Sequence, residues 1–183
     1  MRDLIIRNIN GKKVLLLFLL TNFVYCIMLL ITIPAVMSFS SGMKLLDMMP
    51  MGYYHAYVNT LFTTLGKEGR DAYLFRQLPV DMIYPFLFGI SSCLVLAYFL
   101  NQIGKLNGPL FYICFIPFFS GLLDYGENIG IITMLKTYPE NIKLYSQITN
   151  IFTMLKSSCT ITYFILLLIL LIVFGKNKLF GKN

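Results

Sequence analysis

Charged residues are scarce in this chain, where Asp, Glu, Lys and Arg make up only 13% of the 183 residues. A soluble domain of this length carries roughly 25% charged residues. The hydrophobic residues, 57% of the total, are gathered into long continuous runs, whereas the strands of a membrane β-barrel alternate apolar and polar residues. The composition argues against both of those classes and predicts a membrane protein built from helices.

Motifs that would signal a familiar chemistry are also missing. The four cysteines, Cys26, Cys93, Cys114 and Cys159, form no Cys-x-x-Cys pair, so we expect small buried apolar residues rather than a redox site. Zinc sites use closely spaced ligand pairs, and His55 is the only histidine. The chain has no serine-centred elbow, phosphate loop or nucleotide fingerprint, and no internal repeat typical of transporters. We therefore predict no metal and no cofactor.

Four apolar segments are each long enough to cross ~30 Å of hydrocarbon as a helix. They cover about residues 14–37, 81–100, 109–135 and 150–174. The first follows basic residues, as a signal peptide would, but it is longer than the ~7–15 apolar residues of a signal and lacks a clean cleavage site. The predicted fold class is an all-α membrane protein, a four-transmembrane-helix bundle forming a single domain over residues 1–183.

The connection between the first two spans, about residues 38–80, is too apolar and aromatic for a disordered linker. A helix is predicted from Pro50 to a C-terminal glycine at Gly66, and a second short helix over about residues 67–78. We expect both helices to cap the bundle on the extracytoplasmic side, at the depth that tyrosine rings prefer. Alternatively, their methionines and tyrosines grip an acyl chain or a partner helix.

Basic residues are unevenly distributed, and membrane proteins keep them on the cytoplasmic side. Eight of the 15 Lys and Arg residues flank the spans on one side and face a single acid, Asp3. These eight are Arg2, Arg7, Lys12, Lys13, Lys105, Lys176, Lys178 and Lys182. Seven acids balance the other seven bases, so the whole formal charge of +7 lies on one side. We expect both termini of a multi-pass cell-membrane protein to be cytoplasmic.

The basic pI of about 9.2 does not indicate a nucleic-acid partner. The bases are split among three short flanks, and no binding motif organises them. They instead favour anionic lipid headgroups. The expected partners are therefore membrane lipids, with a second membrane protein or another copy of the chain as the alternative.

Three polar side chains interrupt the third apolar segment at Asp124, Glu127 and Asn128. Spacings of three and four residues place them on one side of a helix. Ionisable groups at membrane depth cost roughly 2.5–3.5 kcal/mol each on insertion scales, and they usually face a protein interior or a watery cavity. We therefore expect the function of this protein to lie on this side of the third helix.

Depth along the helices extends this set of residues to the other spans. At ~1.5 Å per residue, Asp124 lies roughly 22 Å and Glu127 about 27 Å above the start of its span. Counted back along the fourth span, Lys156 reaches the same height of ~27 Å, and Asp81 begins the second span there. The predicted layer occupies the outer third of the bundle. Above it, Arg70, Tyr73 and Gln77 share one side of the second loop helix, and His55 belongs to the helix before it.

Three hypotheses account for this layer. Clustered carboxylates can hold different protonation states, so an enzyme acting on a lipid at the outer leaflet is one of them. A metal site built from His55 and the carboxylates is the second, although the ligand spacing is weak. In the third, Arg70 and Lys156 form interhelical ion pairs with Asp124 and Glu127, and these pairs only fix the assembly.

Three stretches of the chain resemble a group of small bacterial four-helix membrane proteins. The stretches are Leu65-Gly-Lys-Glu-Gly-Arg-Asp-Ala-Tyr73, Asp81-x-x-Tyr-Pro85 and Asp124-Tyr-Gly-Glu-Asn128. The resemblance covers most of the chain from Tyr53 to Tyr138. It implies a four-helix architecture and a polar site, and it implies no activity. The residues that it marks are Arg70, Tyr73, Asp81, Asp124, Glu127 and Asn128.

The sequence thus predicts a polar pocket near the outer leaflet that binds or processes a lipid or small amphiphile. Asp124 and Glu127 are the candidate catalytic pair, while Arg70 and Lys156 would hold a phosphate or carboxylate. The other candidate substrate-binding residues are Tyr73, Asp81, Asn128 and His55. The alternative is a non-enzymatic helper, such as an assembly subunit, immunity factor or sensor, whose buried charges are structural ion pairs.

Overall fold

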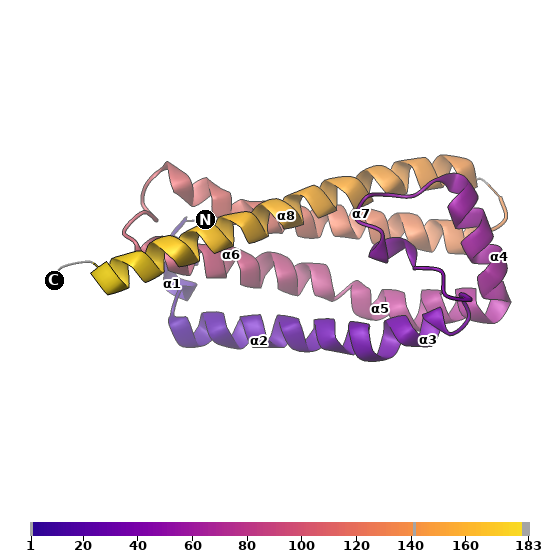
Figure 1. Ribbon diagram of the computed structural model, residues 1–183, viewed down its shortest axis with the longest axis horizontal. Coiled ribbons are helices and arrows are strands. Elements are labelled where there is room, and N and C mark those ends of the chain that lie inside the picture. Colours follow the sequence, from indigo (N-terminus) through magenta and orange to yellow (C-terminus); the bar gives the residue numbers. More distant parts are fainter. Residues whose placement is uncertain (1, 141, 181–183) are drawn as a thin grey trace.

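The computed structural model describes residues 2–140 and 142–180, and its regular secondary structure within those ranges is helical, without a strand. Four helical segments are long and apolar enough to cross a membrane. This confirms the predicted four-helix membrane bundle (Figure 1). Both described chain ends lie at one end of the bundle, hereafter the basic end, and α4 covers the other, hereafter the cap end. Lys182, one of the predicted cytoplasmic bases, lies outside the described residues.

The first span follows the short helix α1 (Arg2–Asn8) and consists of three pieces. They are α2 (Gly11–Ile27), one π-helical turn η1 (Met28–Thr32) and α3 (Ile33–Met37). The Asn10 side chain caps the first turn of α2 by accepting a backbone hydrogen bond. A π-turn adds a residue to the helix and is frequent at functional sites. Here it ends at Thr32, which takes part in the polar network described below.

The cap consists of a short 3₁₀ turn, η2 (Leu46–Met48), and of α4 (His55–Ala72). Within α4, Gly66 breaks the helix with a φ of 61°, a left-handed value that suits glycine. Figure 1 shows α4 lying across the cap end, after which the chain runs along the bundle through η3 (Tyr73–Gln77) and α5 (Leu78–Asp81). The second predicted cap helix, residues 67–78, is therefore divided between the last turns of α4, after the break at Gly66, and the segment that leads into the second span.

The remaining spans are α6 (Tyr84–Gln102), α7 (Ile116–Thr137), which the 3₁₀ segment η4 (Pro109–Phe115) precedes, and α8 (Ile142–Phe180). Consecutive spans run in opposite directions and pack side by side, α2 on α6, α6 on α7 and α7 on α8. The first and last helices of this row, α2 and α8, form no comparable interface in the described part of the chain. The bundle is therefore open along one side.

Glycines allow α7 to approach its neighbours closely. A Cβ at Gly121 would meet the Pro85 carbonyl oxygen of α6 at 2.6 Å, and one at Gly126 would meet the Phe152 ring of α8 at 2.6 Å. Gly130 lies against Thr149 of α8 in the same way. Small residues four apart are common where membrane helices touch, since they let the backbones come together. This contact brings polar groups of α7 and α8 within reach of each other.

Two apolar cores fill the bundle, one at each end. The core at the cap end includes Val36, Phe62 and Met134, while the core at the basic end includes Leu96 and Leu100. On α7, both Asp124 and Glu127 fall between the residues of one core and those of the other. The fold therefore sandwiches a layer of buried polar residues between two apolar regions.

Candidate functional site

The centre of the polar layer is Lys156 of α8. Its ammonium group donates to Asp124 Oδ1 at 3.0 Å and also to Glu127 Oε2, so one cation serves two carboxylates of α7. Glu127 is fully buried, and the side chain of Asp124 is 10% exposed. Isolated charges are very costly to bury, and such pairing offsets that cost. The spacing of three residues between the two acids lets them flank the same lysine.

Thr153, one turn before Lys156, completes the environment of Glu127. Its hydroxyl donates to Glu127 Oε1 at 2.6 Å and lies 3.4 Å from the hydroxyl of Tyr53 in the cap loop. Burial raises the pKa of Tyr53 above its ordinary value, so this phenol stays neutral. Both oxygens of the Glu127 carboxylate are thus engaged within the protein, and the group is shielded from any ligand.

Asn128 connects the layer to the end of α5. Its amide nitrogen donates to the backbone carbonyl of Asp81 at 3.2 Å, while its Oδ1 atom is buried without a hydrogen-bond partner among the described residues. Asp81 itself is 3% exposed, and its charged neighbours include Asp124 and Glu127. Acceptors therefore outnumber donors in this part of the layer, a condition that folded proteins seldom tolerate without a reason.

The cap loop contributes a further acid, Asp47 of η2, which sequence reasoning did not single out. Its carboxylate accepts hydrogen bonds from the Tyr73 hydroxyl at 2.8 Å and from Gln77 Nε2 at 3.1 Å. The Gln77 side chain also bonds Thr32 at the end of the first π-turn. The π-turn η3 thus presents two side chains to one loop carboxylate, and Thr32 of the other π-turn joins the network through Gln77. This network holds the loop inside the bundle.

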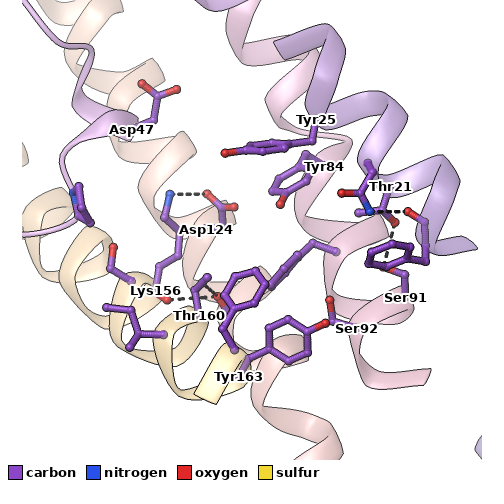
Figure 2. Close-up of a pocket in the computed structure, with 18 of the residues that line it drawn as sticks. Thr21, Tyr25, Asp47, Tyr84, Ser91, Ser92, Asp124, Lys156, Thr160 and Tyr163 are labelled. Carbon is purple, nitrogen blue, oxygen red and sulfur yellow. Dashed lines mark hydrogen bonds and ion pairs between the residues drawn. The ribbon is translucent and has the colours of Figure 1, made fainter. Parts of the chain in front are cut away.

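A cavity of about 460 Å³ lies beside Lys156 (Figure 2). Its lining continues along α6 to Ser91 and Ser92, toward the basic end. Asp47 and Asp124 are the acids that line it, and Lys156 is the one base among its lining residues. Figure 2 shows Tyr25 and Tyr84 opposite Asp124 across the space. Further polar lining residues come from α2, α6, α7 and α8, namely Thr21, Asn22, Ser91, Ser92, Ser120, Ser157, Thr160 and Tyr163.

The cavity opens sideways, between α2 and α8. Its rim there includes Phe18 and Tyr25 of α2 and Ile161 and Phe164 of α8, each 40% to 55% exposed. These two helices do not pack on each other within the described residues. In a membrane, the exposed apolar surface beside this gap faces lipid. The cavity therefore has several polar groups on a largely apolar wall, and its rim between α2 and α8 is apolar and exposed.

The structure brings five of the predicted site residues into one layer and places three elsewhere. Asp81, Asp124, Glu127, Asn128 and Lys156 form the layer. Tyr73 points to Asp47 of the loop. Arg70 donates to the Phe62 carbonyl at 2.7 Å and stacks over the Tyr138 ring at 4.6 Å. His55 begins α4 and lines a separate surface hollow with Asn59 and Lys143.

The turn at Gly66 explains why Arg70 lies apart from the carboxylates, while His55 lies at the far end of α4. The turn redirects the chain so that the guanidinium of Arg70 reaches back to the α4 backbone instead of down into the bundle. No group of three or more metal-binding side chains occurs among the described residues. The proposed ion pair between Arg70 and Asp124 does not form, and both acids turn to Lys156 instead.

The sequence contains a pattern that indicates the polar side of α8 and that the prediction overlooked. Thr149, Thr153, Lys156 and Thr160 follow one another at spacings of four, three and four residues within an apolar helix. Such spacing places them on one side, facing α7. Ser120 of α7 bonds Thr160 at 2.7 Å, which continues this polar seam below Lys156. Asp47 carried no such signal, because its position depends on how the loop folds.

No known protein family, curated protein or solved structure matches the chain. The resemblance to small bacterial four-helix membrane proteins therefore stays a prediction. What this site does has to be argued from its own geometry.

Proposed function

We propose that the protein binds a lipid or small amphiphile in the cavity beside Asp124, with the polar head inside and the apolar chain leaving between α2 and α8. The observation that carries this proposal is the cavity. Its volume of about 460 Å³ falls within the range of ligand pockets, roughly 300–1,000 Å³. Membrane-protein interiors are close-packed like those of other proteins, and a network of ion pairs alone would not need such a space.

Binding is better supported than catalysis by the arrangement of the two acids. Glu127 is fully buried, both of its oxygens are engaged, and it does not line the cavity. A general acid or base has to lie within hydrogen-bond reach of its substrate. Asp124 does line the cavity, so it remains the ionisable group available to a ligand. We therefore assign Asp124 to recognition and Glu127 to holding Lys156 in place.

The proposed location is the outer leaflet of the cell membrane. The basic end carries both described chain ends and the unbalanced positive charge, which favours the cytoplasmic side. The cap end, including α4, would then be extracytoplasmic. The layer around Lys156 lies nearer to the cap than to the termini, so the cavity would meet lipids of the outer half of the bilayer.

A non-enzymatic helper remains the second candidate, because one observation favours it. Lys156 is bonded to both Asp124 and Glu127 without any ligand, as expected for ion pairs that fix two helices in register. In that function the cavity would be a contact site for another membrane helix. The two proposals differ in whether a lipid enters the cavity of the isolated protein.

An introduced tryptophan offers a direct test of whether lipid enters the cavity, since the chain contains no tryptophan of its own. Phe88 lines the cavity and is 8% exposed, so Phe88→Trp places a unique fluorophore inside. The protein would be studied in nanodiscs of phospholipid with brominated acyl chains, which quench nearby tryptophan. Ser157→Phe fills the cavity from α8, while the neighbouring Ser158→Phe adds the same bulk outside it and serves as the control.

We expect strong quenching of the introduced tryptophan that Ser157→Phe reduces and Ser158→Phe leaves unchanged, because only the first blocks an acyl chain. Ile172→Trp, on the exposed side of α8, gives the full quenching expected at the lipid surface. If the Ser157→Phe and Ser158→Phe proteins are quenched equally, acyl chains do not enter the cavity and the proposal fails. The helper function would then be the better account.

A further inference from the structure

The charges around the cavity are unbalanced. Asp47 and Asp124 line it, and Lys156, its one lining base, is already bonded to Asp124 and to Glu127 behind it. Arg70, the other cation considered for binding an anion, lies against Tyr138. No unpaired positive charge therefore faces the cavity among the described residues. A phosphate or carboxylate head placed there would meet carboxylates without a free partner, which costs energy in a low-dielectric site.

Donors are the missing partners in this region. The Oδ1 atom of Asn128 is buried without a donor among the described residues, and Asp81 adds a fourth carboxylate to those of Asp47, Asp124 and Glu127. An ammonium group has three N–H donors and no acceptor. Asn128, Asp81 and Glu127 do not line the cavity, so an ammonium there would contact Asp124, which does. It would add a second positive charge, after Lys156, to a region with four carboxylates, and further hydrogen-bond donors to Asp124.

The wall of the cavity opposite Asp124 also suits an ammonium group. Tyr25 and Tyr84 are stacked with ring centroids 5.4 Å apart, and Figure 2 shows them across the cavity from Asp124. Tyrosine oxygens accept hydrogen bonds from an ammonium group, and aromatic rings attract cations. The wall thus adds acceptors and aromatic surface around a central carboxylate.

We infer that the cavity selects amphiphiles with an ammonium head, held between Asp124 and the Tyr25–Tyr84 pair. This inference rests on the proposed function and narrows it to a chemical class. The ammonium can belong to a soluble alkylamine or to an amine-bearing phospholipid, and the lateral opening between α2 and α8 admits either. The recognition needs no reaction, since the carboxylate and the ammonium simply form an ion pair inside the bundle.

The test uses the Phe88→Trp protein in uncharged maltoside detergent, titrated with ω-bromo alkyl amine, alkyl alcohol and alkyl phosphate of one chain length. We expect the amine to quench at about tenfold lower concentration than the alcohol, and the phosphate to be weakest. Asp124→Asn should abolish the preference for the amine over the alcohol. Asp71→Asn, at an exposed acid of α4, is the control that keeps the preference.

A second variant tests the aromatic wall and leaves the ion pair between Asp124 and Lys156 intact. Tyr25→Leu removes one aromatic wall at a residue that is 40% exposed, while Phe23→Leu makes a similar change on the same helix outside the cavity. We expect Tyr25→Leu to reduce the amine preference several-fold and Phe23→Leu to keep it. Nanodiscs of brominated phosphatidylethanolamine and phosphatidylglycerol then separate the sources, because an amine phospholipid quenches the cavity tryptophan more strongly only if it is itself bound.

Two failures are distinguishable. If amine, alcohol and phosphate quench equally and Ser157→Phe still blocks all three, the cavity binds amphiphiles without selecting their charge, and only the ammonium inference is overturned. If Ser157→Phe changes nothing for any probe, the proposed function fails as well. An unchanged amine preference in Asp124→Asn would also overturn the inference.

Discussion

At the scale of residues, one ammonium group decides whether two buried carboxylates are tolerable. Lys156 contacts both Asp124 and Glu127, and Thr153 supplies the remaining donor to Glu127. Removing one partner from a buried pair leaves an uncompensated charge, which costs more than the pair itself contributes. The two residue-scale predictions concern these interactions.

Lys156→Met should destabilise the protein by about 3–5 kcal/mol, because it leaves two buried carboxylates without their cation. Lys143→Met, at an exposed lysine near the start of the same helix, should change little. Adding Glu127→Gln to Lys156→Met should recover part of the loss, since it removes one of the stranded charges. Thermal unfolding of the purified variants in detergent measures these differences, and wild-type stability of Lys156→Met would contradict the ion-pair arrangement.

Thr153→Val keeps the shape of the side chain and removes the donor to Glu127 Oε1. We expect a loss of about 1.5–3 kcal/mol, typical of a hydrogen bond to a charged group. Thr153→Ser restores the hydroxyl and should retain most of the stability. Thr162→Val is the matched control, because that hydroxyl is exposed and bonds only its own helix. Equal stability of the two valine variants would show that Glu127 does not depend on Thr153.

At the scale of elements, the position of the polar layer follows from how closely α7 packs on its neighbours. Gly121 faces α6, whereas Gly126 and Gly130 face α8. Larger side chains would hold the helices apart, and Lys156 would then fall short of the carboxylates. The cap loop acts similarly from the other side, since Asp47 ties η2 to the π-turn of Tyr73 and Gln77.

Gly121→Val should destabilise the bundle by about 1–3 kcal/mol, as overpacking of a close contact does. The added Cβ meets a backbone carbonyl oxygen at 2.6 Å, and a backbone atom cannot rotate away as a side chain can. Gly175→Val, where a Cβ meets nothing within 4 Å, is the control. Unfolding temperatures of the two variants should differ clearly. If they agree, α6 and α7 are not in this close contact.

At the scale of the whole molecule, the bundle is a row of four spans rather than a closed ring. Both described chain ends lie at the basic end, and the first and last spans leave an opening beside the cavity. Lateral access suits a membrane ligand, which arrives through the bilayer instead of from water. The charge distribution predicts the orientation of this row in the membrane, with the balanced cap on one side and the excess of bases on the other.

The orientation can be tested by cysteine accessibility in intact cells. With the exposed Cys26 replaced by serine, Asn59→Cys on α4 should react with a membrane-impermeant maleimide. Asn177→Cys, near the end of α8, should react only after the cells are permeabilised, because the positive side stays in the cytoplasm. The reverse pattern would invert the proposed topology and move the cavity to the inner leaflet.

The sequence by itself determined the membrane class, the four spans and the layer around Asp124, Glu127 and Lys156. Hydrophobic length and helical periodicity are local properties, and the low dielectric of the membrane makes every charge in a span informative. The depth of a residue in the membrane can be calculated from its position along a regular helix, so residues of different spans can be assigned to the same layer. No such physical constraint applies to the resemblance to small bacterial four-helix membrane proteins, or to the chemistry that the site performs.

Only the tertiary structure decided which groups meet and where space remains. Arg70 lies apart from the layer because Gly66 turns the chain, and Asp47 enters the bundle because its loop folds inward. The cavity exists because α2 and α8 do not pack together. Such features depend on the packing of distant segments, which local periodicity does not encode.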